Sequence, residues 1–286
     1  MKILSDIIGH EGIGNFTANF FTRMPYSVPS GAKNFTQKLT WEVIKDILDD
    51  NKSILRIVKN GVMTRDYASM SFEEAQKFHQ MGHTLLLKNA EKSSKELLNL
   101  ADDFSKSFKT EVDIQLYCTP EGHNAFGWHY DVEEVFIIQA KGSKHYTIRP
   151  NTIHPNPLVK SIPKDLGYEK ETSDIEIKVL MKEGDFLYIP SGWWHVAETQ
   201  SESMHISIGL MPRSVIDIVE HLPNYLAKNS FWRTRFPVHQ SFETIEDKIS
   251  FYKEGFETLS KDLSKIIQDE DFILDFLTNN SRNSES

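Results

Sequence analysis

The segment Gly184–His195 reads GDFLYIPSGWWH and shows how the middle of the chain is built. Residues 186–189 are apolar or aromatic, as in a buried strand. The Pro190-Ser191-Gly192 that follows is typical of a tight turn. The segment therefore predicts a strand, a turn and a second strand that begins with His195.

Five further runs around this segment have the same β-rich character, and glycine, proline and asparagine separate them. They are Val112–Cys118, Val135–Ala140, Tyr146–Arg149, Ile175–Leu180 and His205–Leu210. Short strands with turn residues between them, and no long helix among them, predict a sandwich or barrel, the jelly roll included. The fold class is therefore mainly β with flanking helices.

The flanks of this β-rich part have helical spacing. Upstream, helices are expected after Thr40, after the capping box at Ser71 and over residues 94–108. The buried face of the last of these is predicted to carry Leu97, Leu98, Ala101 and Phe104.

Downstream, a helix beginning near Val215 is expected to end or kink at Pro223, and helical spacing over 242–277 is expected to break near Gly255. We assign residues 1–212 to a catalytic domain with its N-terminal flank and residues 213–286 to a helical region. A helical region this apolar needs a partner surface, either the barrel or a second copy of the chain. The second alternative predicts a homodimer through these helices.

The composition excludes several classes of protein. The 286 residues contain 32 Lys and Arg against 41 Asp and Glu, a net charge of −9, so nucleic acid is not an expected partner. The single cysteine, Cys118, excludes a disulfide framework and a multi-cysteine zinc site. No apolar run is long enough to span a membrane, and the first residues do not build a signal peptide. We expect a cytoplasmic protein without a membrane partner.

Three residues have the spacing of a metal site. In a strand, residues i and i+2 point to the same face, so His129 and Asp131 can converge on one ion, and His195 can complete the set from another strand. Chance alone gives about 0.7 His-x-Asp pairs in this composition, so the pair matters only through its β-rich context. Two imidazoles and a carboxylate with open positions suit non-haem Fe(II).

Five motifs extend this pattern over residues 54–213. They are Gly82–Leu87 (GHTLLL), Tyr117–Pro120 (YCTP), Phe126–Asp131 (FGWHYD), Val135–Lys144 (VFIIQAKGSK) and Glu183–His195 (EGDFLYIPSGWWH). In this order they resemble the JmjC-type cupin oxygenases, in the branch that contains the ribosomal oxygenases and asparaginyl-hydroxylase-like proteins. The resemblance implies a double-stranded β-helix in which His129, Asp131 and His195 hold Fe(II).

The resemblance also implies a co-substrate site. Lys144 stands where the family has the cation that pairs with the distal carboxylate of 2-oxoglutarate, and a charge-assisted hydrogen bond there is about twice as strong as a neutral one. Tyr117 is expected to donate its hydroxyl to the same carboxylate. Ser207 is assigned to this site with them, and His205 lies on the same face of the last strand. For both, an outward-facing position or a core position is an open alternative.

Two departures from the family pattern concern the substrate. Gln115 stands where ribosomal oxygenases usually have asparagine, and the longer amide would reshape the pocket edge. About 75 residues follow the last strand, which leaves room for the family's helical dimerisation region but hardly for its winged-helix domain. The substrate need not therefore be a ribosomal protein. Of Trp193 and Trp194, one is expected in the core and the other beside the substrate channel.

The function expected from the resemblance is that of an Fe(II)- and 2-oxoglutarate-dependent dioxygenase. It would use O₂ to hydroxylate a C–H bond of a side chain in a protein or peptide, with succinate and CO₂ as co-products. Two alternatives stay open: a JmjC-type Nε-methyl-lysine demethylase, and a cupin that binds metal without oxidising anything. Lys144 discriminates against the second, because a binding cupin needs no cation opposite a dicarboxylate.

Overall fold

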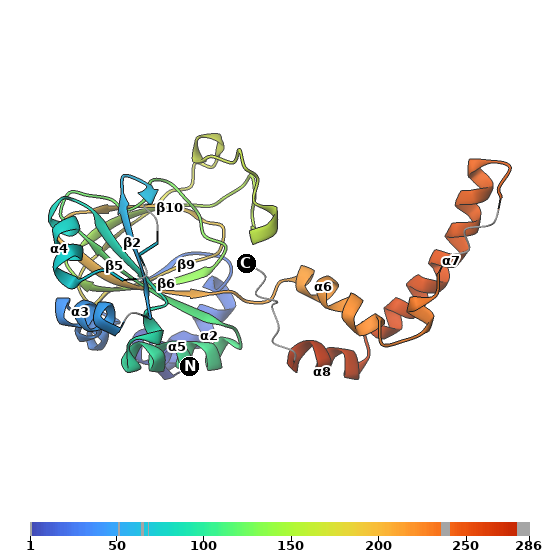
Figure 1. Cartoon of the computed structure of the whole chain (residues 1–286), viewed down its shortest axis with the longest axis horizontal. Coiled ribbons are helices and arrows are strands. Elements are labelled where there is room, and N and C mark those ends of the chain that lie inside the picture. Colours follow the sequence, from blue (N-terminus) through green and yellow to red (C-terminus); the bar gives the residue numbers. More distant parts are fainter. Residues whose placement is uncertain (1, 51, 64–65, 68, 236–240, 279–286) are drawn as a thin grey trace. The chain divides into compact units, whose positions relative to one another are not determined.

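The computed structural model describes residues 2–50, 52–63, 66–67, 69–235 and 241–278 (Figure 1). The chain divides into two compact units, Met1–Pro212 and Arg213–Ser286. The helices of the first unit are α1 (Lys2–Ile8), α2 (His10–Asn15), α3 (Trp41–Asp50), α4 (Phe72–Gln80) and α5 (Lys95–Phe108). Those of the second unit are α6 (Val215–Leu226), α7 (Ile245–Ile266) and α8 (Glu270–Thr278).

The strands that the structure describes lie in the first unit. They are β1 (Tyr26–Val28), β2 (Ile54–Lys59), β3 (Val62–Met63), β4 (Thr84–Lys88), β5 (Val112–Thr119), β6 (Glu134–Lys141), β7 (Lys144–Arg149), β8 (Ile177–Met181), β9 (Phe186–Ile189), β10 (Trp194–Thr199) and β11 (Ser203–Leu210). The six runs predicted from the sequence correspond to β5, β6, β7, β8, β9 and β11.

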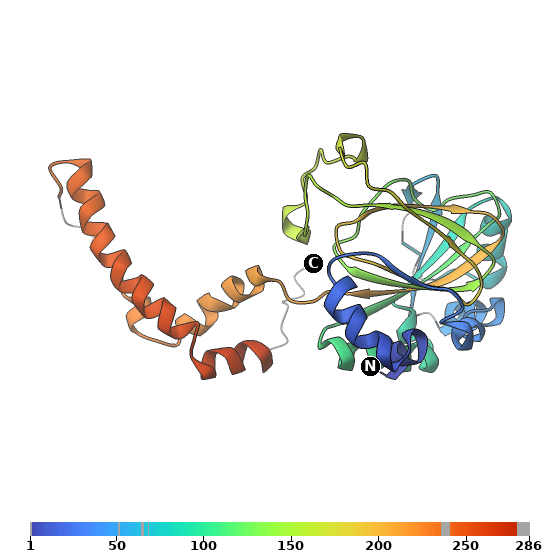
Figure 2. The same cartoon turned by 180° about the vertical axis from the view of Figure 1, so that it is seen from behind.

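Two antiparallel sheets make up the first unit. The larger has the strand order β1-β9-β6-β11-β5-β4-β2-β3, and the smaller has the order β10-β7-β8. Figures 1 and 2 show the small sheet facing the large one, with α3 and α5 on the opposite side of the large sheet. This arrangement confirms the mainly β fold with flanking helices expected from the sequence.

Side chains of the large sheet point alternately into two hydrophobic cores, one on each face of the sheet. Along β6, Phe136 and Ile138 belong to the core shared with the helices, whereas Val135 and Ile137 belong to a smaller cluster between the two sheets. The alternation follows from the pleat of the strand. Cys118 of β5 lies on the helical side, where burial raises the pKa of its thiol to about 12.

Capping residues begin the helices that cover the sheet. Ser71 and Glu74 form the predicted capping box at the start of α4, because each side chain accepts a hydrogen bond from the other's backbone N–H. Ser94 caps α5 through a 3.4 Å hydrogen bond from the backbone N–H of Leu97. These local bonds fix where the two helices start.

The predicted buried face of α5 is wrong at one position. Leu98 is 46% exposed, whereas Leu100 is 1% exposed and packs in the core with Leu97 and Phe104. Successive residues of a helix are rotated by about 100°, so Leu97 and Leu100 lie on one face and Leu98 lies beside it. The buried face predicted from the sequence is therefore rotated toward solvent relative to the face that packs in the core.

Two predicted helix ends are absent from the second unit, whereas the alternative of a kink at Pro223 stays a prediction. Pro223 lies inside α6, which continues for one turn beyond it, and α7 runs through Gly255 without interruption. A glycine inside a helix costs about 1 kcal/mol, which a helix of 22 residues tolerates. The break lies further on, between α7 and α8. None of the helices that the structure describes is long and apolar enough to cross a membrane.

The position of the α5 face can be tested by a matched pair of variants. Leu100→Ala should lower the free energy of unfolding by about 2–4 kcal/mol, because it leaves a cavity in the core, whereas Leu98→Ala should lower it by less than about 1 kcal/mol. Chemical denaturation of the two variants measures both values. Equal losses would contradict the observed orientation of the helix.

Candidate metal centre

His129 and His195 lie opposite each other in an isolated antiparallel bridge. The backbone N–H of His195 donates to the carbonyl of His129 over 2.8 Å, and the N–H of His129 donates to the carbonyl of His195 over 3.1 Å. The expectation that a regular strand carries both His129 and Asp131 is wrong, because Asp131 lies in the loop that leads to β6. The bridge, rather than a strand, holds the two histidines together.

The turn before His195 is tied to the segment that carries Asp131. The backbone N–H of Gly192 donates to the carbonyl of Asp131 over 2.8 Å. Gly192 has a φ of +80°, which favours glycine, and a Cβ added there would lie 2.7 Å from Cδ of Pro157. The turn thus needs a glycine both for its backbone conformation and for the close approach of Pro157.

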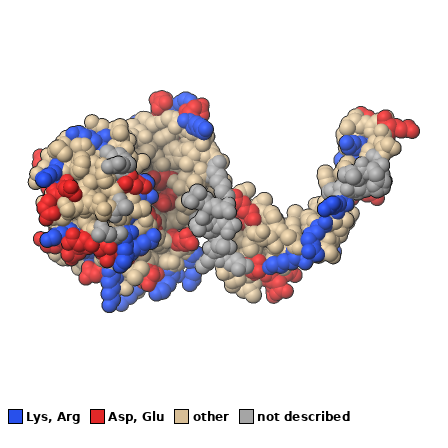
Figure 3. Space-filling model, viewed as in Figure 1, with Lys and Arg blue, Asp and Glu red and all other residues tan. Residues whose placement is uncertain are grey.

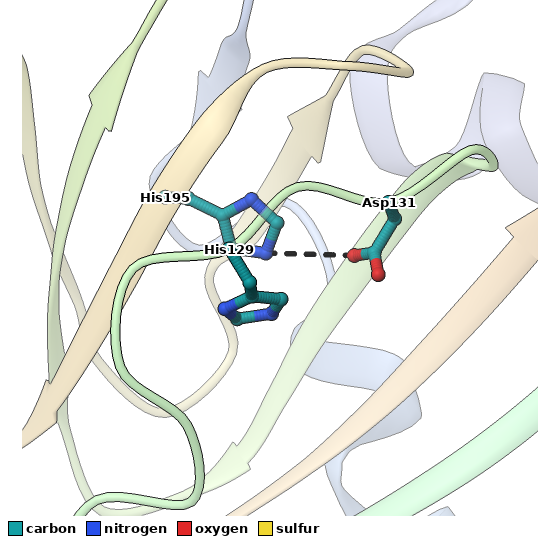
Figure 4. A group of neighbouring side chains, drawn as sticks. All are labelled: His129, Asp131 and His195. Atoms are coloured by element: carbon teal, nitrogen blue, oxygen red, sulfur yellow. Dashed lines mark ion pairs between the residues drawn. The ribbon is translucent and has the colours of Figure 1, made fainter. Parts of the chain in front are cut away.

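The side chains of His129, Asp131 and His195 converge on one point (Figure 4). One ligand atom from each lies within 4.8 Å of the other two, and Nε2 of His195 is 3.5 Å from Oδ2 of Asp131. The structure therefore brings together the three residues that the sequence predicted as ligands. This donor set is the one that non-haem Fe(II) prefers, with coordination positions left for other ligands.

Both imidazoles have their second nitrogen occupied by a backbone carbonyl. Nδ1 of His129 lies 2.8 Å from the carbonyl of Gly127, and Nδ1 of His195 lies 3.0 Å from that of Trp193. Because a carbonyl only accepts, each Nδ1 carries the hydrogen and each Nε2 keeps its lone pair for a metal. Burial and the neighbouring His129 ring lower the pKa of His195 to about 4, which keeps it neutral.

A pocket opens beside these three residues and contains all the predicted co-substrate residues. Its lining consists of Tyr117, Ala125, Phe126, His129, Asp131, Val135, Ile137, Lys144, Tyr146, His195, Ala197, His205 and Ser207. The strands β5, β6, β7, β10 and β11 contribute most of them, so the pocket lies between the two sheets. Metal ligands and a buried cation therefore share one cavity.

Lys144 is a buried cation with neutral partners. It is 3% exposed, and its Nζ lies 3.1 Å from Oγ1 of Thr119 and 3.2 Å from Nδ1 of His205. Burial lowers the pKa of Lys144 to about 7. Among the described residues no carboxylate forms an ion pair with it. The site therefore lacks the negative charge that would normally accompany a buried ammonium group.

Tyr117 lines the pocket, and a chain of polar contacts holds its side chain in place. Its hydroxyl donates to Oε1 of Gln115 over 3.0 Å, and Nε2 of Gln115 donates to Oδ2 of Asp113 over 2.7 Å. Burial raises the pKa of Tyr117 well above its usual value. Gln115, the departure from the family pattern, thus orients the tyrosine. Its predicted bond to a co-substrate carboxylate stays a prediction.

His205 and Ser207 face the pocket from β11. His205 is 6% exposed, and its ring stacks on that of Tyr117 with centroids 4.6 Å apart and planes 8° apart. Ser207 pairs in register with Gln115 of β5 and Ile137 of β6. The outward-facing alternative for these two residues is therefore wrong.

Sequence reasoning missed several residues of the site, among them Thr119, Phe126 and Tyr146. Thr119 contacts Lys144, and Phe126 and Tyr146 line the pocket. The period of two could have found Thr119 and Tyr146, since each follows a predicted site residue by two positions. Trp193 and Trp194 are not among the lining residues: Trp194 is buried against Tyr130, and Trp193 packs on the cluster between the sheets.

A family model places the site in a known domain type. Residues 87–218 match the family described as the JmjC domain, and this range contains His129, Asp131, Lys144 and His195. This segment is a JmjC domain. The surrounding fold agrees with solved structures: YcfD, a ribosomal oxygenase from Escherichia coli in complex with cobalt and 2-oxoglutarate, has a TM-score of 0.61 at 15% identity. The match covers 93% of this chain and 70% of that one.

Curated proteins are similar to about half of the chain. Bifunctional lysine-specific demethylase and histidyl-hydroxylase NO66 of Drosophila persimilis is 28% identical over 162 residues, which are 54% of this chain and 23% of that protein. Ribosomal oxygenase 2 of Mus musculus is 30% identical over 153 residues, which are 52% and 32%. The chain spans less than a third of the length of these relatives.

The metal site can be tested with two neighbouring carboxyl groups. Asp131→Asn should weaken the binding of Co²⁺, used as a stand-in for Fe(II), by more than about 100-fold, because the ligand loses its charge. Glu133→Gln, two residues away and outside the converging group, should leave the affinity within about threefold. Calorimetric titration with CoCl₂ measures both. Wild-type affinity in the Asp131 variant would exclude this residue as a ligand.

Proposed function

We propose that this chain is an Fe(II)- and 2-oxoglutarate-dependent oxygenase that hydroxylates a side chain of a protein or peptide. The overall reaction consumes 2-oxoglutarate, O₂ and a C–H bond, and yields succinate, CO₂ and a C–OH group. The proposal rests on the position of Lys144. A cation without a counter-charge, in the same pocket as two imidazoles and a carboxylate, suits a dicarboxylate that meets a metal at one end and an ammonium group at the other.

The residues of the pocket fit this co-substrate. His129, Asp131 and His195 would hold Fe(II), which supplies coordination positions for 2-oxoglutarate and O₂ and the redox chemistry of C–H hydroxylation. Lys144 binds the distal carboxylate and orients the co-substrate. Val135 of β6 and the other apolar side chains of the lining exclude water from the reacting centre. The protein thus contributes positioning and a dry site, and no general base is required.

The substrate class is inferred from the relatives, whose names include histidyl-hydroxylase and lysine-specific demethylase. Both names refer to side chains of polypeptides, which supports a protein or peptide substrate for this JmjC domain. The net charge of −9 favours a basic segment through electrostatic steering. Figure 3 shows acidic side chains beside basic ones on the visible face of residues 1–212, so this steering would be weak.

Two other functions are weighed against the same pocket. Demethylation of Nε-methyl-lysine begins with hydroxylation of the methyl group, so the metal ligands and Lys144 would serve it equally, and the name of one relative includes it. Hydroxylation is favoured because the names of two relatives include histidyl-hydroxylase and ribosomal oxygenase, whereas demethylase appears only in the first of them. A non-oxidising cupin is disfavoured because a protein that only binds a metal does not need a buried lysine such as Lys144 without a counter-charge.

We also propose that the helical second unit associates with a second copy of the chain. Among its described residues, 213–235 and 241–278, only Phe272 is buried. Apolar side chains lie exposed at helical spacing: Val215 and Val219 of α6 are 81% and 53% exposed, and Ile245 and Ile249 of α7 are 61% and 55% exposed. Amphipathic helices gain most of their stability by burying such faces. A second copy offers the same faces, as expected for a symmetric dimer.

Uncoupled turnover tests the proposed reaction. The protein with Fe(II), 2-oxoglutarate and O₂ should release succinate, and the His129→Ala variant should release none because it lacks a metal ligand. Quantified succinate and anaerobic binding of 2-oxoglutarate are the measurements. A wild-type protein that neither binds the co-substrate nor forms succinate would exclude an oxygenase. A search by mass spectrometry for a peptide gaining 16 Da, about the mass of one oxygen, would then identify the substrate.

The same assay tests the role of Lys144. Lys144→Ala should raise the apparent KM for 2-oxoglutarate by about tenfold or more, since it removes a charge-assisted bond. With a pKa of about 7, the amine is charged below that pH and neutral above it, so the wild-type affinity should fall as the pH rises through this value. Arginine stays protonated, so Lys144→Arg should bind with little dependence on pH. An unchanged KM in Lys144→Ala would place the anchor elsewhere.

Light scattering tests the proposed homodimer. The full chain should have the mass of two copies at micromolar concentration, and Ile245→Glu combined with Ile249→Glu should shift it to one copy by placing charges on the apolar face. Lys253→Glu, an exposed substitution on the same helix, should leave the dimer intact. A monomeric wild-type protein would contradict the proposal.

A further inference from the structure

Among the described residues, His205 is a polar side chain of the pocket that contacts both Lys144 and Tyr117, two of the three predicted co-substrate residues. On one side, its Nδ1 lies 3.2 Å from Nζ of Lys144. On the other, its ring stacks on Tyr117, with which it also pairs in register between β11 and β5. It is 6% exposed and lines the pocket. His205 therefore connects Lys144 with Tyr117, between which the described residues show no direct hydrogen bond.

The hydrogen-bonding capacity of Lys144 shows what His205 contributes. An ammonium group has three donors and no acceptor. One donor points to Oγ1 of Thr119 at 3.1 Å and another to Nδ1 of His205 at 3.2 Å. The third is left for a ligand in the pocket. For His205 to accept this bond, its Nδ1 must be unprotonated, and burial together with the charge of Lys144 lowers the pKa of His205 well below its usual value.

The ring of His205 is itself held in place. Tyr117 supports one face of the imidazole with nearly parallel planes, 8° apart. The tyrosine is fixed by the bond from its hydroxyl to Gln115, which is fixed in turn by Asp113. A chain of contacts thus extends from Asp113 to Lys144 through Gln115, Tyr117 and His205. This chain determines where Nδ1 points, and hence where the amine points.

We propose that His205 is a positioning residue for co-substrate binding: by accepting a hydrogen bond from Lys144, it directs the remaining N–H of the amine to the distal carboxylate of 2-oxoglutarate. The inference rests on the proposed function and deepens it. His205 is not a catalytic residue in this view, because it acts through Lys144. Its loss should therefore weaken co-substrate binding rather than slow the reaction of the bound complex.

Two substitutions separate the acceptor from the ring. His205→Phe keeps an aromatic ring to stack on Tyr117 but removes the acceptor, whereas His205→Asn keeps an acceptor near the position of Nδ1 and removes the ring. His205→Phe should raise the KM for 2-oxoglutarate by about tenfold, the effect of about 1.4 kcal/mol, with kcat at saturation within about threefold. His205→Asn should leave both constants within about threefold of wild type.

Binding measurements and a matched control complete the test. Calorimetric titration of the Co²⁺-loaded full chain with 2-oxoglutarate under anaerobic conditions should show the same loss in His205→Phe, with Co²⁺ affinity unchanged. His145→Phe, on the neighbouring position of β7 and therefore on the opposite face from Lys144, should behave as wild type. Thr119→Val removes the other acceptor and should raise KM in the same way, which provides a second measurement if His205→Phe does not fold.

The outcomes are distinct. Wild-type KM in His205→Phe, or impairment of His205→Asn alone, would show that the ring acts by packing and would overturn the proposal. A lower kcat with unchanged KM would also overturn it, because it would place His205 in the chemical step. These results apply only if the wild-type protein turns over 2-oxoglutarate. A wild-type protein without that activity would instead overturn the proposed function.

Discussion

The pleat of the large sheet is the constraint on which both the core and the site depend. On β5, Leu116 and Cys118 pack toward the helices while Tyr117 and Thr119 face the pocket. A shift of one residue in strand register would exchange these two sets, exposing the apolar core to the pocket and burying the polar site residues among helices. Core packing therefore enforces the arrangement of the site, and the two cannot vary independently.

Much of this arrangement follows from local patterns. Strands, turns and caps depend on neighbouring residues, which is why the jelly roll and the capping box at Ser71 could be predicted from the sequence. The convergence of His129 and Asp131 was expected for an incomplete reason: a backbone bridge to His195 holds His129, and a loop carries Asp131. Leu98 was misjudged because the local pattern does not determine which face of α5 the core covers, and Gly255 because a helix of 22 residues tolerates a single glycine.

The buried cation gives the pocket its electrostatic character. Removing an ammonium group from water is unfavourable unless a partner charge compensates for it. Among the residues that the structure describes, Lys144 has the dipoles of Thr119 and His205 to compensate, and no carboxylate. An anion that enters the pocket therefore relieves a cost already present in the folded protein, and the protein with the anion bound should be the more stable form.

Gly192 has a consequence for how the sequence can change. Its positive φ disfavours every other residue, and Pro157 occupies the space that a side chain would need. A substitution at position 192 therefore requires a different turn and also a retreat of the segment that carries Pro157. In related sequences that keep this architecture, the two positions should change together or not at all. The long connection between β7 and β8 can vary freely in evolution only away from this contact.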